Sequence, residues 1–294
     1  MKNSESLVGK TFDTFNVVLM LLLSIVMIYP MWYVVCASLS DSSELLRLNG
    51  ILLTPLGFNL ESYKSVIGNS MIIKGFVNTV IIVAAGVIVN IIMTSITAYF
   101  LAQKNVYTQK FFMKLIVFTM YFSGGMIPSY LLITKTLGMH DSLLALILPS
   151  AISTYNMIIM RTSFINIPDS LIESAKLDGA DHMTILFRIV LPLSKAILAV
   201  MVLFYAVQHW NSWFQASIYL KTRSKFPLQL ILREILIQND VNSMSVGSAM
   251  DSAYQIGESI KYAIIVVATV PILIVYPFLQ RYFTKGVMIG AVKG

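Results

Sequence analysis

The stretch GFVNTVIIVAAGVIVNIIMTSITAY, residues 75–99, contains no charged residue and consists mainly of aliphatic side chains. A helix needs about 20 residues to cross the hydrocarbon core of a bilayer, and this run is long enough. Apolar runs of similar length recur along the chain, which favours the bilayer as its solvent. The sequence therefore predicts an integral membrane protein.

The composition supports this interpretation over the whole chain. Of the 294 residues, 57% are hydrophobic and only 12% are charged, about half the charged share of a soluble domain. The formal charge of +7 comes from basic residues scattered at the ends of apolar runs, a pattern that favours membrane topology over nucleic-acid binding. The single cysteine, Cys36, excludes an internal disulfide. We expect one membrane domain, residues 1–294, in contact with lipid.

Six apolar runs are predicted to be transmembrane helices, because backbone groups in lipid must form hydrogen bonds within their own segment. The expected fold class is all-α and polytopic. The predicted spans are Phe15–Leu39, Gly75–Tyr99, Phe111–Ile133, Leu143–Phe164, Ala196–Ala216 and Tyr262–Leu279.

The positions of lysine and arginine predict the orientation of these spans. Most of the 21 basic residues lie in the shorter set of connecting segments and at the two termini, so both termini are expected in the cytoplasm. The longer segments Ser40–Lys74 and Ser217–Lys261 are then outside. Leucine and isoleucine recur at helical spacing over Leu228–Ile237, which predicts an ordered outer cap, either a surface for a partner or a lid without one.

The loop between the fourth and fifth spans, residues 167–195, is polar and punctuated for two short helices. Pro168 and Asp169 are typical of a helix start, and Ser170 with Glu173 has the spacing of a capping box. Gly179 follows where the first helix would end, since glycine enters the left-handed conformation without steric cost.

A second helix is predicted after this glycine. Asp181 is placed to cap it, and Pro192 is expected to stop or kink it. The expected apolar face consists of Met183, Leu186, Phe187 and Val190. Two amphipathic helices joined at an elbow suit insertion into a groove on a soluble partner.

This loop resembles the EAA loop of the permeases of binding-protein-dependent ABC importers. The matching pattern is Glu173-Ser174-Ala175, then Gly179, then Ile189-Val190-Leu191-Pro192, with Ser174 in place of the family's first alanine. Serine is also small, so this departure leaves the pattern intact.

Three further segments resemble the second permease of the maltose-type carbohydrate branch. They are Leu177-Asp178-Gly179-Ala180, Trp210-Asn211 and the terminal run from Gln280-Arg281-Tyr282-Phe283 to Gly290-Ala291-Val292-Lys293-Gly294. The resemblance implies an importer core over about residues 75–281 and a cytoplasmic tail over 280–294. The segment from Lys221 to Lys261, with the tail, resembles the subgroup for oligosaccharides released from complex polysaccharides.

The resemblance also implies partners and roles. A cytoplasmic ATPase would dock on the loop through Glu173, Ala175, Asp178, Gly179, Ala180 and Pro192, and the tail residues Gly290, Val292 and Lys293 would reach between two ATPase subunits. Glu173 would form an ion pair, Ala175 and Ala180 would allow close helix approach, and Gly179 would form the elbow. A second, homologous permease and an extracytoplasmic solute-binding protein would complete the assembly in a bacterial or archaeal cytoplasmic membrane.

The chain carries no residues that point to catalysis. It has no Gly-x-x-x-x-Gly-Lys-Ser/Thr loop, so ATP and Mg²⁺ are expected on the partner ATPase and no cofactor on this chain. The histidines His140, His182 and His209 lack metal-ligand spacing. We therefore expect a transport subunit and not an enzyme.

A sugar path would be lined by amide, hydroxyl and aromatic groups. Such candidates are Asn78, Asn90, Thr94, Thr97, Gln208, His209, Trp210 and Asn211. Polar residues inside spans equally serve as contacts between helices, and Trp210 with Trp213 could belong to the interfacial aromatic belt. The alternative to an ABC permease is a secondary transporter or channel for a small polar solute. That class usually shows ionisable pairs inside its spans or inverted repeats, which the sequence lacks.

Overall fold

The computed structural model describes residues 7–48, 50–104, 106–244 and 259–277, and within them the regular elements are helices, with no strand. The chain divides into two compact units, Met1–Asn69 with Glu234–Val270, and Ser70–Arg233 with Pro271–Gly294. The all-α prediction is confirmed for the described part of the chain.

The first unit contains α1 (Leu7–Ser38), α2 (Ser42–Arg47), α3 (Glu61–Gly68) and most of the helix Ser259–Pro277. Its small core consists of Cys36, Ala37, Leu45 and Leu52. The hydroxyl of Ser259 contacts the hydroxyls of Ser42 and Ser62, the latter at 2.7 Å.

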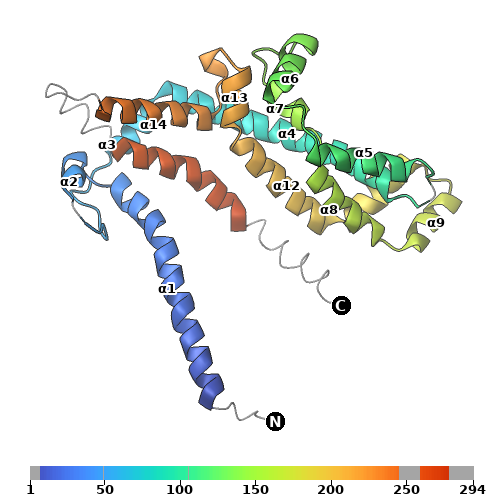
Figure 1. Ribbon diagram of the computed structural model, residues 1–294, viewed down its shortest axis with the longest axis horizontal. Coiled ribbons are helices and arrows are strands. Elements are labelled where there is room, and N and C mark those ends of the chain that lie inside the picture. Colours follow the sequence, from blue (N-terminus) through green and yellow to red (C-terminus); the bar gives the residue numbers. More distant parts are fainter. Residues whose placement is uncertain (1–6, 49, 105, 245–258, 278–294) are drawn as a thin grey trace. The chain divides into compact units, whose positions relative to one another are not determined.

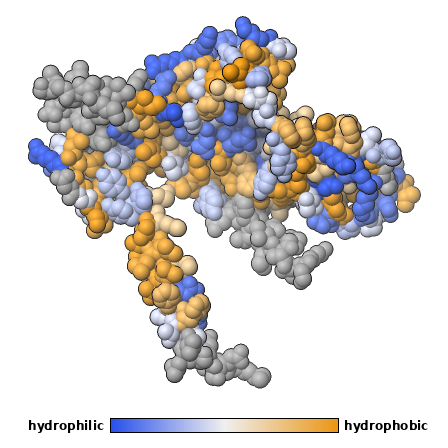
Figure 2. Space-filling model, viewed as in Figure 1, coloured by the Kyte–Doolittle hydropathy of each residue, from blue (hydrophilic) through white to orange (hydrophobic). Residues whose placement is uncertain are grey.

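Most of the apolar side chains of α1 between Phe12 and Val35 are exposed within this chain, and Figure 2 shows a long hydrophobic stretch on this helix. A helix that is hydrophobic on all sides needs lipid or another apolar partner around it. This is the behaviour expected of a membrane span.

The second unit is built around the long helix α4 (Ser70–Ala102), beside which α8 and α12 run (Figure 1). Its other elements follow in chain order: α5 (Gln109–Tyr121), α6 (Met126–Leu131), η1 (Leu132–Thr136), α7 (Leu144–Ile147), η2 (Leu148–Ser150), α8 (Thr154–Ile165), α9 (Asp169–Leu177), α10 (His182–Ile185), η3 (Leu186–Val190), α11 (Leu191–Leu193), α12 (Lys195–Trp210), α13 (Trp213–Tyr219), η4 (Arg223–Lys225) and the first residues of α14 (Leu228–Met244).

Three helices in the described residues are long and apolar enough to cross a membrane: Thr11–Ser38, Ser70–Ala102 and Ser259–Pro277. Three bent pairs reach this length and composition together, which gives up to six spans if each pair is one span. The pairs are Gln109–Tyr121 with Met126–Thr136, Leu144–Ser150 with Thr154–Ile165, and His182–Leu193 with Lys195–Trp210.

The prediction of a continuous helix over Phe111–Ile133 was wrong. The chain bends by 114° between α5 and α6, where Gly124 and Gly125 interrupt the helix and Gly125 has a φ of 85°. The predicted fourth span bends by 50° before α8, and the predicted fifth span ends early, because α12 stops at Trp210. The last two predicted residues of the sixth span, Phe278 and Leu279, lie outside the described residues.

Small and polar residues of α4 allow other elements to pack closely on it. Gly75, Thr79, Gly86, Asn90 and Thr94 are all buried. A side chain at Gly86 would collide with the ring of His209 in α12. Without a hydrophobic driving force between helices in lipid, such close approach and polar contact are what hold a bundle together.

Candidate functional site

The candidate site is the loop between α8 and α12, residues 167–195, which we call the coupling loop. Its first helix, α9, ends at Leu177. Gly179 follows with a φ of 81°, in the left-handed region that glycine enters freely. An added Cβ at Gly179 would meet nothing within 4 Å, so the backbone angle and not crowding is what requires glycine. The predicted elbow is confirmed.

The predicted cap of the second helix is also confirmed. The carboxylate of Asp181 accepts hydrogen bonds from the backbone N–H groups of Met183, at 3.2 Å, and Thr184, at 3.3 Å. The hydroxyl of Thr184 donates to the same carboxylate. This hydroxyl bond, followed by the two backbone bonds, holds the pKa of Asp181 below its usual range.

The predicted capping box at the first helix was wrong. The helix already begins at Asp169, so Ser170 lies inside the first turn and cannot occupy the cap position. Pro168 stands at that position and makes no side-chain cap bond. Its fixed φ of −57° orients the chain for helix entry instead.

The second helix continues through Pro192. It comprises α10, a π-helical turn (η3) and α11, and Pro192 lies in the first turn of α11, where a missing N–H group is tolerated. After Leu193 the direction changes by 89° into α12. The prediction that Pro192 stops or kinks the helix was therefore wrong, because the helix passes through it and the bend falls two residues later, at Ser194.

The buried face of this second helix differs from the prediction. Ile185, Leu186 and Val190 are buried, whereas Met183 and Phe187 are about half exposed. The π-turn accounts for Phe187, because the wider turn rotates the side chains from Leu186 onward away from the 3.6-residue register, whereas Met183 and Ile185 precede this turn.

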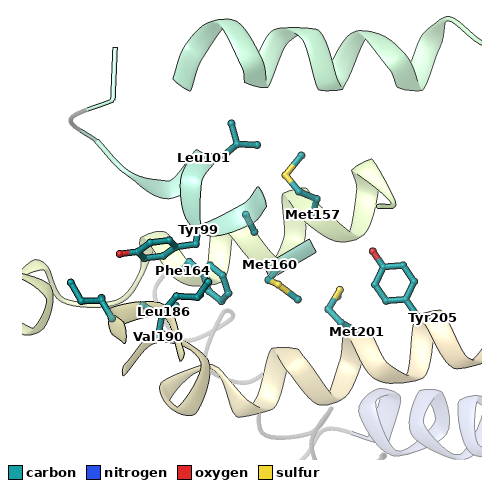
Figure 3. Packing of buried hydrophobic residues seen from close by; sticks show 11 residues of the cluster. Tyr99, Leu101, Met157, Met160, Phe164, Leu186, Val190, Met201 and Tyr205 are labelled. Atoms are coloured by element: carbon teal, nitrogen blue, oxygen red, sulfur yellow. The ribbon is translucent and has the colours of Figure 1, made fainter. Parts of the chain in front are cut away.

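The coupling loop is joined to the membrane helices by a shared apolar core (Figure 3). Leu186 and Val190 pack there with Tyr99 and Leu101 of α4 and with residues of α8 and α12. The core members are Ala98, Tyr99, Leu101, Met157, Met160, Phe164, Ile185, Leu186, Val190, Met201 and Tyr205. A force applied to the loop would therefore be transmitted to α4, α8 and α12 together.

Polar contacts add to this attachment. Lys104 Nζ lies 2.6 Å from Asp169 Oδ2, and the Tyr99 hydroxyl lies 3.1 Å from Nδ1 of His182. Arg161 Nε donates to the carbonyl oxygen of Leu101 at 2.7 Å. Sequence reasoning missed these residues, since the partners are 60 or more positions apart and no spacing pattern relates them.

The residues predicted to dock an ATPase lie on the accessible side of the coupling loop. Glu173, Asp178 and Gly179 are exposed, while Ala175 and Ala180 are half-buried against the apolar core. Among the described residues, the Glu173 carboxylate has no ion-pair partner. It lines a groove with Lys104, Lys176 and Gln103, between the ends of α4 and α8 and the side of α9. Docking itself stays a prediction.

Two of the predicted sugar-path residues make contacts between helices inside this chain. Asn90 donates to the carbonyl oxygen of Ser150, and its Oδ1 lies 2.6 Å from Nε2 of His209. The Thr94 hydroxyl lies 2.7 Å from the hydroxyl of Tyr205, and both residues are fully buried. The polar groups of Asn90 and Thr94 thus have hydrogen-bond partners within the chain even when no substrate is bound. A role for both residues in the sugar path stays a prediction.

Three more of the path candidates, Asn78, Trp210 and Asn211, lie toward the opposite end of α4 from the coupling loop. Asn78 donates to the carbonyl oxygens of Ser224, at 2.8 Å, and Phe226, at 3.1 Å. Trp210 is buried against Phe76, and its indole N–H has no hydrogen-bond partner in the described part of the chain. Asn211 is exposed and donates to a carbonyl one turn back in α12. The predicted tail contacts Gly290, Val292 and Lys293 lie outside the described residues.

Known proteins similar to this chain include two from Bacillus subtilis that match at 40% identity. One is the polygalacturonan/rhamnogalacturonan transport system permease protein YtcP, over 291 residues, which covers 97% of this chain and 99% of the relative. The other is protein LplC, over 294 residues, which covers 100% and 98%. The arabinooligosaccharide permease AraQ of the same organism is 28% identical over 297 residues, covering 96% and 98%. No protein-family model matches the chain.

One solved structure has a fold similar to that of this chain. It is described as a bacterial ABC transporter involved in the import of the acidic polysaccharide alginate, and it covers 95% of this chain and 98% of its own chain. The TM-score is 0.85 at 29% sequence identity. The match extends over nearly the whole of both chains, so it concerns the complete helical architecture.

Proposed function

The chain belongs to the permease subunits of ABC importers for carbohydrates and oligosaccharides, and we propose that it moves an oligosaccharide inward when a partner ATPase pulls on the coupling loop. As a permease of this family it is not an enzyme, and ATP is hydrolysed by a separate subunit. A secondary transporter or channel is thereby excluded.

The observation that carries the coupling proposal is the construction of the loop. The solvent-exposed side of the loop carries an acidic residue, Glu173, without an ion-pair partner in the described residues. The opposite, buried side of the loop packs in the apolar core shared with α4, α8 and α12. An ATPase that binds Glu173 through a basic side chain would therefore hold a lever that is rigidly attached to the membrane helices.

The proposed assembly contains this permease, a second homologous permease, two ATPase subunits and an external binding protein in a bacterial or archaeal cytoplasmic membrane. We propose six spans with both termini in the cytoplasm, a single membrane domain over residues 1–294 and an importer core over 75–281. Tail residues Gly290, Val292 and Lys293 would contact the ATPase subunits. ATP and Mg²⁺ would bind the ATPases, with no cofactor on this chain.

The proposed substrate class is an oligosaccharide released from a complex polysaccharide. It is supported by the names of the relatives, which refer to polygalacturonan, rhamnogalacturonan and arabinooligosaccharides. Alternation between inward- and outward-open states is energetically feasible, because reversing a 1:99 ratio takes about 5.5 kcal/mol of differential binding. Nucleotide and binding protein together can supply this amount.

The test is the substitution Glu173→Ala in the full transporter. If Glu173 anchors the ATPase, its loss leaves a buried basic partner unpaired, and the ATPase should co-purify with the membrane subunits at least tenfold less well. The matched control is Glu61→Ala, which removes an exposed carboxylate from a segment predicted to lie outside. Equal recovery of the ATPase from Glu173→Ala and unmodified membranes would remove Glu173 from this role.

A further inference from the structure

Trp213 and Arg233 form a stacked pair in residues 213–233, which include the first six residues of the predicted cap Leu228–Ile237 and which we call the outer cap from here on. The guanidinium carbon of Arg233 lies 3.6 Å from the centroid of the Trp213 ring, a favourable cation–π distance. Arg233 is exposed, and within the described residues it makes no ion pair or hydrogen bond with an acidic group. The indole covers one face of the guanidinium, so the N–H groups along its edges stay available for a ligand.

The outer cap is firmly seated on α4. The Thr79 hydroxyl accepts a hydrogen bond from the backbone N–H of Leu228 at 2.8 Å, which caps the start of α14. Gly75 leaves room for α14, since an added Cβ would lie 3.2 Å from the Leu228 Cα. Asn78 holds two carbonyl groups of the preceding segment. Arg233 therefore stands on a fixed platform, and binding a ligand there would cost little conformational entropy.

Positive charge predominates on the outer cap. Its basic residues are Lys221, Arg223, Lys225 and Arg233, and residues 213–233 contain no aspartate or glutamate. Glu234 follows on the same helix, about 100° further around the axis. A surface of one sign concentrates ligands of the opposite sign.

Asp141 also faces the cap, and the hydrogen-bonding capacity of its carboxylate is already used. Asp141 accepts from the hydroxyl of Thr222 at 2.6 Å and from the backbone N–H groups of Lys221 and Thr222 at 2.9 Å. Lys225 Nζ also lies 2.9 Å from its carboxylate. Asp141 thus neutralises Lys225 and leaves Arg233 to an external anion.

We propose that the Trp213–Arg233 pair binds a carboxylate of an acidic oligosaccharide, a uronate, as it enters the permease. This proposal rests on the proposed transport function and deepens it by naming the substrate class. Planar guanidinium groups bind carboxylates through two parallel hydrogen bonds. Relatives of this chain are named for polygalacturonan and for the acidic polysaccharide alginate, both of which carry a carboxylate on each uronic acid unit.

The test measures equilibrium binding of trigalacturonate to the whole transporter in lipid nanodiscs, without the binding protein. Arg233→Gln should weaken this binding about tenfold, the size of one charge-assisted hydrogen-bonded pair. Binding of the fully methyl-esterified trisaccharide should be equally strong in Arg233→Gln and in the unmodified transporter. The control Lys221→Gln removes the same charge from an exposed cap residue without an aromatic platform and should change binding less than twofold. Arg233→Lys should retain part of the affinity.

Several outcomes would overturn the proposal. They are equal losses in Arg233→Gln and Lys221→Gln, an equal loss for the acid and its ester, and no preference for the acid in the unmodified transporter. A fourth is that Arg233→Gln raises only the concentration of binding protein needed to stimulate ATP hydrolysis, which would assign Arg233 to a protein contact. The proposed function fails separately, if the complete transporter shows no ATP-driven uptake of any oligosaccharide.

Discussion

Gly86 in the middle of α4 and Gly179 in the coupling loop are required for different physical reasons. At Gly86 an added Cβ would lie 2.6 Å from Cδ2 and 2.7 Å from Cε1 of His209, so space is limiting. At Gly179 there is open space, but the φ of 81° disfavours every residue with a Cβ. The first glycine lets two helices touch, and the second lets an exposed chain turn.

This difference separates the parts of the second unit that maintain the fold from the loop on which we propose that a partner ATPase docks. Around Gly86, the side chains of Asn90 and His209 are buried and bonded to each other. Around Gly179, the neighbouring Asp178 and Leu177 are exposed, with Leu177 at 89%. Damage near Gly86 should therefore reduce stability, and damage near Gly179 should reduce coupling while the protein stays folded.

The largest effect is expected for Gly86→Val. The new side chain forces the His209 ring away from Asn90, and such overpacking costs about 2–3 kcal/mol. The measurement is the thermal unfolding midpoint of the purified transporter. The control is Ala84→Val, which adds the same branching at an exposed position of the same helix. If the two variants unfold at the same temperature, close packing at Gly86 is not what holds α12 on α4.

A smaller loss of stability is expected for Gly179→Val. A β-branched residue in the left-handed region costs about 1–2 kcal/mol, which an exposed loop can avoid by changing its turn. The changed turn would redirect α9, so we expect ATP hydrolysis with little sugar uptake and a normal level of protein in the membrane. Uptake per ATP hydrolysed is the quantity to measure. Gly179→Asn is the control, because asparagine tolerates this conformation better and should preserve coupling. Normal uptake per ATP in Gly179→Val would contradict the elbow's role.

The features of the coupling loop that depend on local sequence could be predicted. The turn at Gly179 and the cap at Asp181 each follow from the properties of one residue type, whereas the bend at Ser194 was wrongly assigned to Pro192. The all-helical fold followed from the apolar runs for the same reason, since lipid leaves the backbone few alternatives.

Features set by tertiary contact could not be predicted. The break at Gly124 and Gly125 lies within an apolar run, and hydropathy does not distinguish a bent span from a straight one. The π-turn at Leu186–Val190 places Phe187 on the exposed side, and Ile185, just before this turn, is buried. The need for glycine at positions 75 and 86 could not be predicted from a single sequence. It arises from the close approach of Leu228 to Gly75 and of His209 to Gly86, more than 100 positions away.

The smallest effect is expected for Lys104→Gln, at the junction of the two regions. The ion pair between Lys104 and Asp169 is short, at 2.6 Å, but both side chains are more than half exposed. Solvent and salt screen such a pair, and its contribution is about 0.5 kcal/mol or less. The unfolding midpoint should then stay within about 1 °C of that of the unmodified transporter at physiological salt. This result would show that packing in the apolar core contributes most of the stability that attaches the loop. A large shift that disappears at high salt would show instead that the ion pair, and not the packing of Ile172 and Ala175 on the apolar core, anchors α9.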